Sequence, residues 1–196
     1  MSTSKNANPY HHGDLREHLI GAALGLMAEG GEDAVSLRAV ARRAGVSAMA
    51  PYRHFADKKS LLEAVAERGF AQLAERLRAA DASGATPAES FAEQGAAYVA
   101  FACAQPMLFR LMFVVAKPQP GTALGQAAER AYGILTSRAD FLRGRLSTAD
   151  LSLMAWSLVH GLATLIIDGR IKGDTPLPPD AIAEHLTRRF AQLLAD

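Results

Sequence analysis

The stretch VSLRAVARRAGVSAMAPYRHFADKKSLL, residues 35–62, decides the fold of its region because its spacing predicts two short helices joined by a tight turn. Ser36 is a suitable N-cap, and apolar residues recur on one helical face after it. Gly45 is expected to end this helix, since glycine adopts a left-handed backbone conformation at little steric cost. Ser47 then opens a second helix whose first turn is exposed. This arrangement is typical of a helix-turn-helix, which sets its second helix in the DNA major groove.

Basic side chains are concentrated in the same stretch. Residues 36–59 contain six Lys and Arg against one acidic residue, whereas the whole chain has 21 Lys and Arg against 20 Asp and Glu. A basic face on a nearly neutral protein is the electrostatic feature of nucleic-acid binding. A solvated helical hairpin is the alternative explanation. The Gly-Val-Ser corner and the neighbouring Tyr52, His54 and Phe55 favour DNA over that alternative.

These residues resemble the DNA-binding domain of the TetR family of bacterial transcriptional regulators. The resemblance covers about residues 14–65 and rests on an ordered series of matches: Ser36-Leu37-Arg38, Val40-Ala41, Ala44-Gly45-Val46-Ser47, Tyr52-Arg53-His54-Phe55, Asp57-Lys58 and Leu61-Leu62. It implies a set of DNA-contacting residues: Ser36, Arg38, Ser47, Ala48, Met49, Ala50, Tyr52, His54 and Lys58. Phosphates or groove edges would be contacted by Arg38, Tyr52, His54 and Lys58, and bases would be read by Ala48, Met49 and Ala50.

The three base-reading positions depart from a polar pattern. Ala48, Met49 and Ala50 have almost no hydrogen-bonding capacity, so readout there is expected to be mainly apolar, as in contact with thymine methyl groups. Pro51 takes the fourth position of a helix that starts at Ser47, where its missing N–H removes one of the first intrahelical bonds. We therefore expect a short second helix. Pro51 either packs against the neighbouring helix or takes part in reading DNA.

The predicted organisation has three parts: a flexible N-terminal arm over residues 1–13, a helix-turn-helix domain over residues 14–58 and a helical ligand-binding and dimerisation domain over residues 59–196. The arm has no apolar run that would indicate a secretory signal peptide. Its polar residues are available to touch a DNA backbone or minor groove. His11 and His12 have no carboxylate–histidine cluster beside them, so no metal site is predicted.

Capping patterns place the predicted helices. Asp57 is expected to cap a long helix from Lys58 to about residue 80, and Thr86 and Glu89 form a capping box for the next helix. No window alternates with the period of two expected for strands, so the chain is predicted to be all-α. The architecture is a three-helix head joined by a long helix to an antiparallel helical bundle. Further helices are expected from Asp14 to Gly30, from Pro106 to Val114 and over residues 122–145, 151–167 and 178–194.

The helix over residues 151–167 is apolar on all sides, which indicates burial in a core, a membrane or a subunit interface. Its length is at the short edge for spanning a membrane, and Ser152, His160 and Thr164 lower its hydrophobicity. We therefore expect no membrane association. One face is expected to fill the core while another face, with the last helix, forms a homodimer. Trp156, His160-Gly161 and Asp168-Gly169 are similar to the ligand-binding and dimerisation region of one TetR subgroup.

An effector site is expected between the helices of the body, because bundles bind small molecules in apolar cavities that contain a few polar groups. The predicted lining combines aromatic rings, methionines and scarce polar groups: Tyr98, Phe101, Cys103, Met107, Phe109, Met112, Phe113, Trp156 and His160. Packing in the core is the competing explanation for each of them, because aromatic stripes at helical spacing usually form core.

The sequence thus predicts a cytoplasmic, homodimeric, TetR-like regulator that represses from a pseudo-palindromic operator on double-stranded DNA. A small apolar or amphipathic effector is expected to release it. Two alternatives remain: a non-specific architectural DNA-binding protein, and an all-helical enzyme that uses His160. The chain has no nucleophile elbow, phosphate-binding glycine loop or His-Glu-x-x-His motif, so no catalytic residue, cofactor or metal is predicted. The single cysteine, Cys103, excludes an intrachain disulfide.

Overall fold

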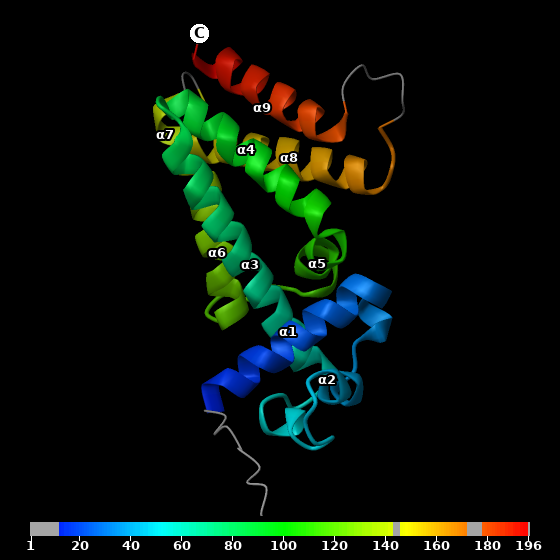
Figure 1. Ribbon diagram of the computed structural model, residues 1–196. Helices are drawn as coiled ribbons and strands as arrows, with labels where there is room; N and C mark the ends of the chain where they lie inside the picture. The colour runs from blue at the N-terminus through cyan, green and yellow to red at the C-terminus, as the bar shows by residue number, and fades with distance from the viewer. Residues whose placement is uncertain (1–11, 143–145, 172–177, 196) are drawn as a thin grey trace, which may run out of the picture. The chain divides into compact units, whose positions relative to one another are not determined.

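The computed structural model describes residues 12–142, 146–171 and 178–195, and every regular element in these ranges is helical (Figure 1). This confirms the predicted all-α class. The chain divides into two compact units, residues 1–65 and 66–196, with the division inside one long helix. We call them the head and the body.

The elements are α1 (His12–Gly30), η1 (Glu32–Ala34), α2 (Leu37–Arg43), η2 (Pro51–Arg53), α3 (Lys58–Ser83), α4 (Pro87–Ala104), α5 (Pro106–Arg110), η3 (Leu111–Val115), α6 (Ala123–Leu135), α7 (Ala139–Leu142), α8 (Thr148–Ile167) and α9 (Pro179–Ala195).

The head is built on a compact apolar core. Its fully or nearly fully buried side chains come from α1, α2 and the start of α3: Leu19, Ala23, Met27, Val35, Leu37, Val40, Ala41, Phe55, Leu61, Leu62 and Val65. As predicted, the Ser36 hydroxyl accepts from the Ala39 N–H at 3.1 Å, and Gly45 has a positive φ of 68°. Asp14 was expected to cap the first helix, but α1 already begins at His12. The remainder of the predicted arm, residues 1–11, lies outside the described residues.

In place of the second helix of the predicted helix-turn-helix, the structure has a tight turn and a short 3₁₀ helix. Ser47 does not act as a side-chain cap; its carbonyl accepts from the Ala50 N–H at 2.9 Å, and a 3₁₀ turn follows over Pro51–Arg53. Pro51 is the first residue of that turn, where the missing N–H costs nothing, and it is buried. Its carbonyl then accepts from the N–H groups of His54 and Phe55. The predicted shortness is confirmed, and burial supports the packing role of Pro51.

The body is organised around α4, which packs along both α8 and α9 (Figure 1). The expected capping box is present: Thr86 Oγ1 accepts from the Glu89 N–H at 3.2 Å, and the Glu89 carboxylate accepts from the Thr86 N–H at 3.2 Å. One buried cluster joins α4, α7, α8 and α9: Phe91, Ala92, Ala139, Leu142, Leu151, Ala155 and Ala191. These four helices therefore share a single apolar core.

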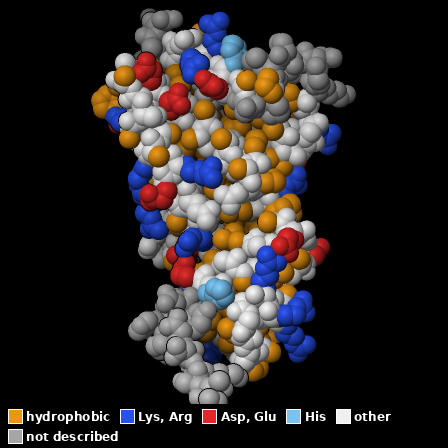
Figure 2. Space-filling view, viewed as in Figure 1, with side chains coloured by type: hydrophobic (Ala, Val, Ile, Leu, Met, Phe, Trp, Pro, Cys, Tyr) orange, Lys and Arg blue, Asp and Glu red, His pale blue; other side chains and the backbone are white. Residues whose placement is uncertain are grey.

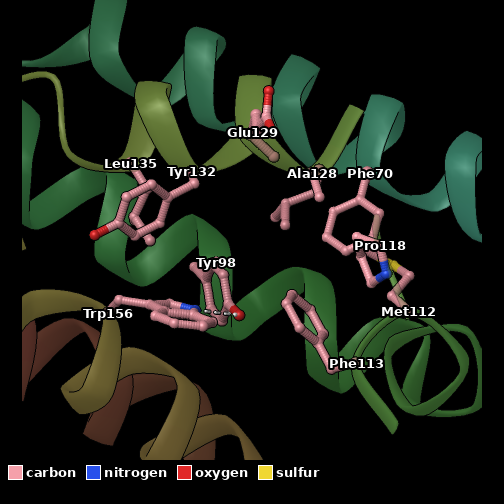
Figure 3. A pocket seen from close by; sticks show the side chains of 12 residues that line it. Phe70, Tyr98, Met112, Phe113, Pro118, Ala128, Glu129, Tyr132, Leu135 and Trp156 are labelled. Atoms are coloured by element: carbon pink, nitrogen blue, oxygen red, sulfur yellow. Dashed lines mark hydrogen bonds between the residues drawn. The ribbon is translucent and has the colours of Figure 1, made fainter. Parts of the chain in front are cut away.

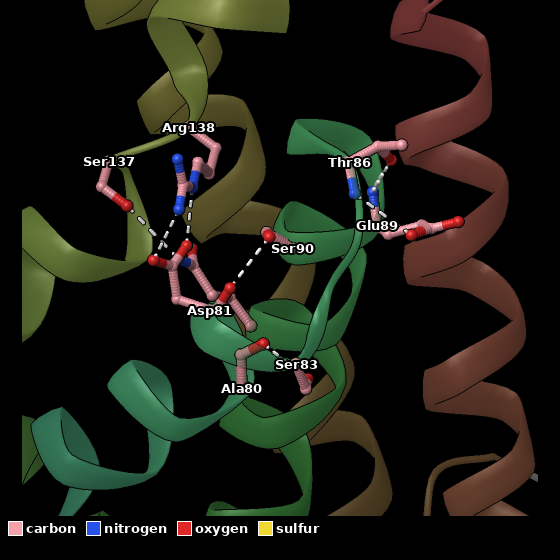
Figure 4. Close-up of polar contacts among 9 residues, drawn as sticks. Ala80, Asp81, Ser83, Thr86, Glu89, Ser90, Ser137 and Arg138 are labelled. Atoms are coloured by element: carbon pink, nitrogen blue, oxygen red, sulfur yellow. Dashed lines mark hydrogen bonds and ion pairs between the residues drawn. The ribbon is translucent and has the colours of Figure 1, made fainter.

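The prediction of a single helix over residues 122–145 is wrong, because α6 ends at Leu135 and α7 is a separate short helix. The break allows Arg138 to reach the C-terminal part of α3, where its Nε and Nη2 donate to the two carboxylate oxygens of Asp81 at 2.7 and 2.8 Å (Figure 4). Gln94 Nε2 donates to the same carboxylate at 2.7 Å. This pairing raises the pKa of Arg138 and links α3, α4 and the α6–α7 junction.

The most apolar helix, α8, begins as predicted, since Ser147 Oγ accepts from the Asp150 N–H at 3.0 Å. By length and composition α8 qualifies as a membrane-spanning helix, and α4 with residues 106–114 would qualify only as a pair bent by 105°. One face of α8 instead belongs to the body core, where Leu151, Ala155, Val159 and Leu162 are buried. Its other face exposes apolar side chains to solvent: Leu153, Met154 and Leu165.

Candidate functional site

The turn that follows α2 presents the predicted base-reading residues to solvent. Met49 is 67% exposed and Tyr52 is 44% exposed, which is unusual for large apolar and aromatic side chains. Ala48 is exposed and Ala50 is half-buried beside them. The hydrogen bonds of the turn are made by backbone groups, so these side chains are not needed to hold it together. An exposed apolar tip on a short rigid turn is suited to contact with base edges.

Arginines surround this turn. Arg38 in α2, Arg42 in α2 and Arg53 in η2 are exposed, and none of them forms an ion pair with another described residue. Lys and Arg side chains gather along one side of the head in the space-filling view (Figure 2). Arginine without an intramolecular partner is available for phosphate oxygens or for guanine. These three residues are the strongest candidates for electrostatic contact with DNA.

Two other basic residues have structural roles inside the head. Arg43 Nη1 donates to Glu29 Oε2 at 2.6 Å, which lowers the pKa of Glu29 and links α2 to α1. Lys58 is half-buried, and its Nζ donates to the Glu32 carbonyl at 3.0 Å and lies 3.8 Å from Glu32 Oε1. A lysine with these partners is less available to a phosphate than a free one. The contribution expected of Lys58 is therefore partly structural.

The remaining predicted DNA residues flank the turn. Ser36 is exposed but its hydroxyl is used in the cap of α2. His54 is half-buried with its ring 6.4 Å from that of Phe55. Ser47 is exposed, and no side-chain bond to it is seen in the described head. The nine residues thus lie on α2, on the turn and at the start of α3.

The body contains an apolar cavity of about 480 Å³. Its walls come from α3, α4, η3, α6 and α8, with Pro118 from the loop before α6 (Figure 3). The lining residues are mostly aromatic or aliphatic: Phe70, Leu73, Tyr98, Met112, Phe113, Pro118, Ala128, Glu129, Ala131, Tyr132, Leu135 and Trp156. This size and polarity fall in the range of small-molecule sites in proteins.

A hydrogen-bonded group lies beside the cavity. Trp156 Nε1 donates to Tyr98 Oη at 3.3 Å, and Tyr98 Oη lies 2.9 Å from His160 Nδ1. Because an indole N–H only donates, the Tyr98 proton is free to go to His160, which places the imidazole proton on Nε2. The His160 ring also contacts Phe109 and Phe113, with ring centroids 5.2 and 4.9 Å apart. The Tyr98 hydroxyl and the Trp156 N–H are therefore satisfied within this group, whereas His160 Nε2–H forms no hydrogen bond inside it.

Burial perturbs both titratable members of this group. It raises the pKa of Tyr98 far above 10, so the phenol is neutral at physiological pH. It lowers the pKa of His160 from 6.5, because the charged imidazolium loses hydration among aromatic rings. The site is therefore uncharged at neutral pH.

The lowered pKa of His160 predicts a pH dependence of stability. In the unfolded chain His160 binds its proton near pH 6.5, whereas in the folded chain it does so only at lower pH. Lowering the pH therefore stabilises the unfolded state more than the folded state. We expect the free energy of unfolding to fall as pH drops below 6.5, until the folded-state pKa is passed. Urea unfolding of the wild type and of His160→Gln, compared between pH 7.5 and 5, measures it. An equal pH dependence in both proteins would contradict the assignment.

Four of the nine predicted lining residues line the cavity: Tyr98, Met112, Phe113 and Trp156. His160 does not line it but contacts it through Tyr98. The other four predicted residues do not line this cavity. Phe101 is fully buried under Arg76, whose guanidinium lies 5.7 Å from the ring centroid, and Phe109 is buried against Tyr98, Phe113 and His160. Cys103 and Met107 face solvent at the α4–α5 junction.

Apart from Pro118, the lining residues that the sequence analysis missed come from α3 and α6. Phe70 and Leu73 look like ordinary core positions of a long helix, and α6 has mixed polarity with Glu129 exposed. The sequence contained one signal for the α6 part, because apolar residues recur there at helical spacing: Ala128, Ala131, Tyr132 and Leu135. Among the described residues, no three His, Cys, Asp or Glu side chains are placed to hold a metal ion.

The fold and these sites define a class of protein: a helix-turn-helix DNA-binding head with a helical body that contains a small-molecule cavity. Two family models match the chain. "Bacterial regulatory proteins, tetR family" matches residues 19–65, and "Tetracyclin repressor-like, C-terminal domain" matches residues 91–190. The chain belongs to the TetR family of bacterial transcriptional regulators, which are not enzymes. The resemblance seen in the sequence is thereby confirmed.

Solved structures and curated proteins agree with this assignment. A Rhodococcus sp. RHA1 protein of unknown function is 32% identical over 96% of this chain and 100% of that one, with a TM-score of 0.82. The transcriptional regulator FadR from Bacillus subtilis, in complex with stearoyl-CoA, shares the fold at 18% identity, with 91% of this chain and 96% of that chain covered and a TM-score of 0.64. The transcriptional repressor KstR of Mycolicibacterium smegmatis is 36% identical over 74 residues. That match spans 38% of this chain and only 36% of KstR.

Proposed function

We propose that this protein is a cytoplasmic repressor that binds a pseudo-palindromic operator as a homodimer and leaves it when a small apolar or amphipathic molecule enters the body cavity. The observation that carries the proposal is the cavity of about 480 Å³, walled by five helical elements, in a chain whose head is a helix-turn-helix. A regulator that needs no signal has no use for such a cavity. The architectural alternative offers no role for it.

The DNA-binding part of the proposal rests on the exposed turn. Met49 projects from it, and Arg38 and Arg53 stand beside it without intramolecular partners. Arginine supplies phosphate contacts or bidentate readout of guanine, and an apolar tip suits thymine methyl groups. One such turn contacts few base pairs, so useful specificity requires two heads.

The dimer part rests on exposed apolar side chains of α8 and α9. Leu153, Met154 and Leu165 on α8 are 47–56% exposed, and Leu186 and Leu193 on α9 are 38% and 76% exposed. Several large apolar side chains exposed on two helices are costly in water, and apolar surface of this kind marks interaction sites. Association of two α8–α9 faces would bury it and would supply two heads on one assembly.

The effector part rests on the cavity and gains support from relatives. The Bacillus subtilis FadR structure holds stearoyl-CoA, a molecule with a long apolar chain, in the same overall fold. KstR, which shares identity with part of this chain, is a repressor. Repression that ends on binding of an apolar or amphipathic molecule is consistent with both.

Selection of bound duplexes from a random oligonucleotide pool tests the proposed function. A recovered palindrome with half-sites centred about one helical turn, or a multiple of it, apart is expected for a two-fold symmetric dimer. Random duplex that displaces the protein as readily as the best selected site would reject the repressor and support the architectural alternative.

Two substitutions should separate positioning on DNA from reading of bases. We expect Arg38→Ala to weaken binding to all duplexes and to lower the slope of log K against log salt by about one unit. Met49→Ala should change the preference at one or two base positions, because an apolar contact is lost. Both are measured by fluorescence anisotropy on the selected operator and on single-base variants.

Lys58→Ala is a useful comparison, since its bond to Glu32 predicts an additional loss of head stability. Unchanged base preference in Met49→Ala together with altered preference in Lys58→Ala would refute this placement of the recognition turn.

A further inference from the structure

We propose that the body cavity is a site for a lipophilic cation, such as a quaternary ammonium group with apolar substituents. This inference rests on the proposed effector function of the same cavity. It goes beyond that function because it assigns a charge and a chemical class to the effector.

Five aromatic rings contribute to the lining, each from a different helical element: Phe70, Tyr98, Phe113, Tyr132 and Trp156. They are not stacked in parallel. Phe70 and Phe113 meet edge to face with centroids 5.2 Å apart, and Tyr132 and Trp156 do the same at 5.6 Å. Rings inclined in this way present faces as well as edges around a space, as Figure 3 shows. Aromatic faces carry partial negative charge and attract cations, most strongly for Trp and Tyr.

Among the residues that the structure describes, Glu129 is the only charged one that lines the cavity, and its charge is negative. It is exposed on α6, and its carboxylate points away from the rings in Figure 3. No Lys or Arg of the described residues forms an ion pair with it, and none lines the cavity. A carboxylate at the rim attracts cations to the cavity and repels anionic head groups. An effector that placed a carboxylate or phosphate inside would find no positive partner there.

Two polar groups among the rings, the Tyr98 hydroxyl and the Trp156 indole N–H, already have partners. Tyr98 accepts from Trp156 and lies within hydrogen-bonding distance of His160. A ligand group that needs a hydrogen bond from either of them would have to break this set. A quaternary ammonium group has no N–H and makes no such demand, and it gains electrostatic attraction from ring faces instead. Aliphatic walls would serve a neutral ligand equally well, whereas five rings and one carboxylate favour a cation.

A matched pair of probes tests the inference. Benzyltrimethylammonium and neopentylbenzene have nearly the same shape, and only the first is charged. Trp156 is the single tryptophan of the chain and lines the cavity, so its fluorescence reports binding of both probes to the intact protein. We expect the cation to bind about tenfold more tightly than its neutral isostere, although hydrophobicity alone favours the hydrocarbon.

Three variants identify the groups responsible. Tyr132→Leu, which removes a partly exposed ring, should lower the affinity for the cation and leave that for neopentylbenzene nearly unchanged. Glu129→Gln should lower only the affinity for the cation, by about two- to threefold at low salt. Phe141→Leu changes an exposed ring outside the cavity, 67% exposed against 40% for Tyr132, and is the control for folding and for fluorescence.

The outcomes separate the two levels of the proposal. If neopentylbenzene binds as tightly as the cation or more tightly, the cation assignment is overturned, and the cavity remains an apolar effector site. If neither probe changes Trp156 fluorescence or the melting temperature, the effector function of the cavity fails together with the inference. A preference for the cation that persists in Tyr132→Leu and in Glu129→Gln would also overturn it.

Discussion

Leu165→Glu is expected to give a monomer and to abolish high-affinity operator binding. Leu165 is 48% exposed on α8, on the face that we assign to the partner subunit. A carboxylate placed in an apolar interface without a partner costs several kcal/mol, which is enough to dissociate most dimers at micromolar concentration. Sedimentation velocity measures the assembly state, and anisotropy on the selected operator measures DNA binding.

The choice of residue follows from the structure. Leu158 and Leu162 on the same helix are less suitable, because Leu162 is 6% exposed and Leu158 is half-buried and lines a small pocket together with Phe190. A glutamate at either position would damage the subunit core and would not report on the interface. Val114→Glu provides the matched control, because Val114 is 71% exposed outside α8 and α9. A Leu165→Glu protein that still sediments as a dimer would reject the assignment of the interface to α8.

Features fixed by neighbouring residues could be predicted from the sequence. Ser36, Thr86 and Ser147 cap helices as expected, and Asp57 accepts from the Ser60 N–H at 2.7 Å at the start of α3. These bonds join residues three positions apart, so the local pattern contains all of the information. Gly45 belongs to the same group, since its positive φ follows from the turn itself.

Features fixed by distant partners could not be predicted. The break between α6 and α7 depends on Arg138 reaching Asp81 on another helix, and nothing near Arg138 in the sequence indicates that partner. The bond of Lys58 to the Glu32 carbonyl could not be predicted either, because it joins residues 26 positions apart. Counting Lys and Arg residues along the sequence does not distinguish side chains that have an intramolecular partner from those that have none.

The cavity illustrates the same limit. Tyr98 and Trp156 could be selected because polar-tipped rings are scarce on the apolar helices α4 and α8. Tyr132 lies on α6, whose polar residues made the helix look like a surface element, and Phe70 lies on the helix expected only to join head and body. Periodicity identifies a buried face, but it does not show whether that face meets another helix or a hollow between helices.

Two glycines of α6 should respond to alanine with opposite signs. Gly125→Ala is expected to lower the free energy of unfolding by roughly 1–3 kcal/mol, as overpacking does. A Cβ at Gly125 would lie 2.0 Å from the Gln119 carbonyl oxygen and 2.9 Å from its carbon, so the backbone of the preceding loop must move. The same loop carries Pro118, which lines the cavity, and probe affinity should therefore fall together with stability.

Gly133→Ala provides the matched substitution on the same helix. Gly133 is exposed, and a Cβ there would meet nothing within 4 Å, so alanine adds no clash. It lowers the conformational entropy of the unfolded chain, and we expect a gain of about 0.5–1 kcal/mol with unchanged probe affinity. Urea unfolding of the two variants beside the wild type gives both values. A loss of stability in Gly133→Ala would contradict the open surface at that position. No loss in Gly125→Ala would show that the loop before α6 does not pack on this helix as the structure places it, and the Pro118 wall of the cavity would have to be reassigned.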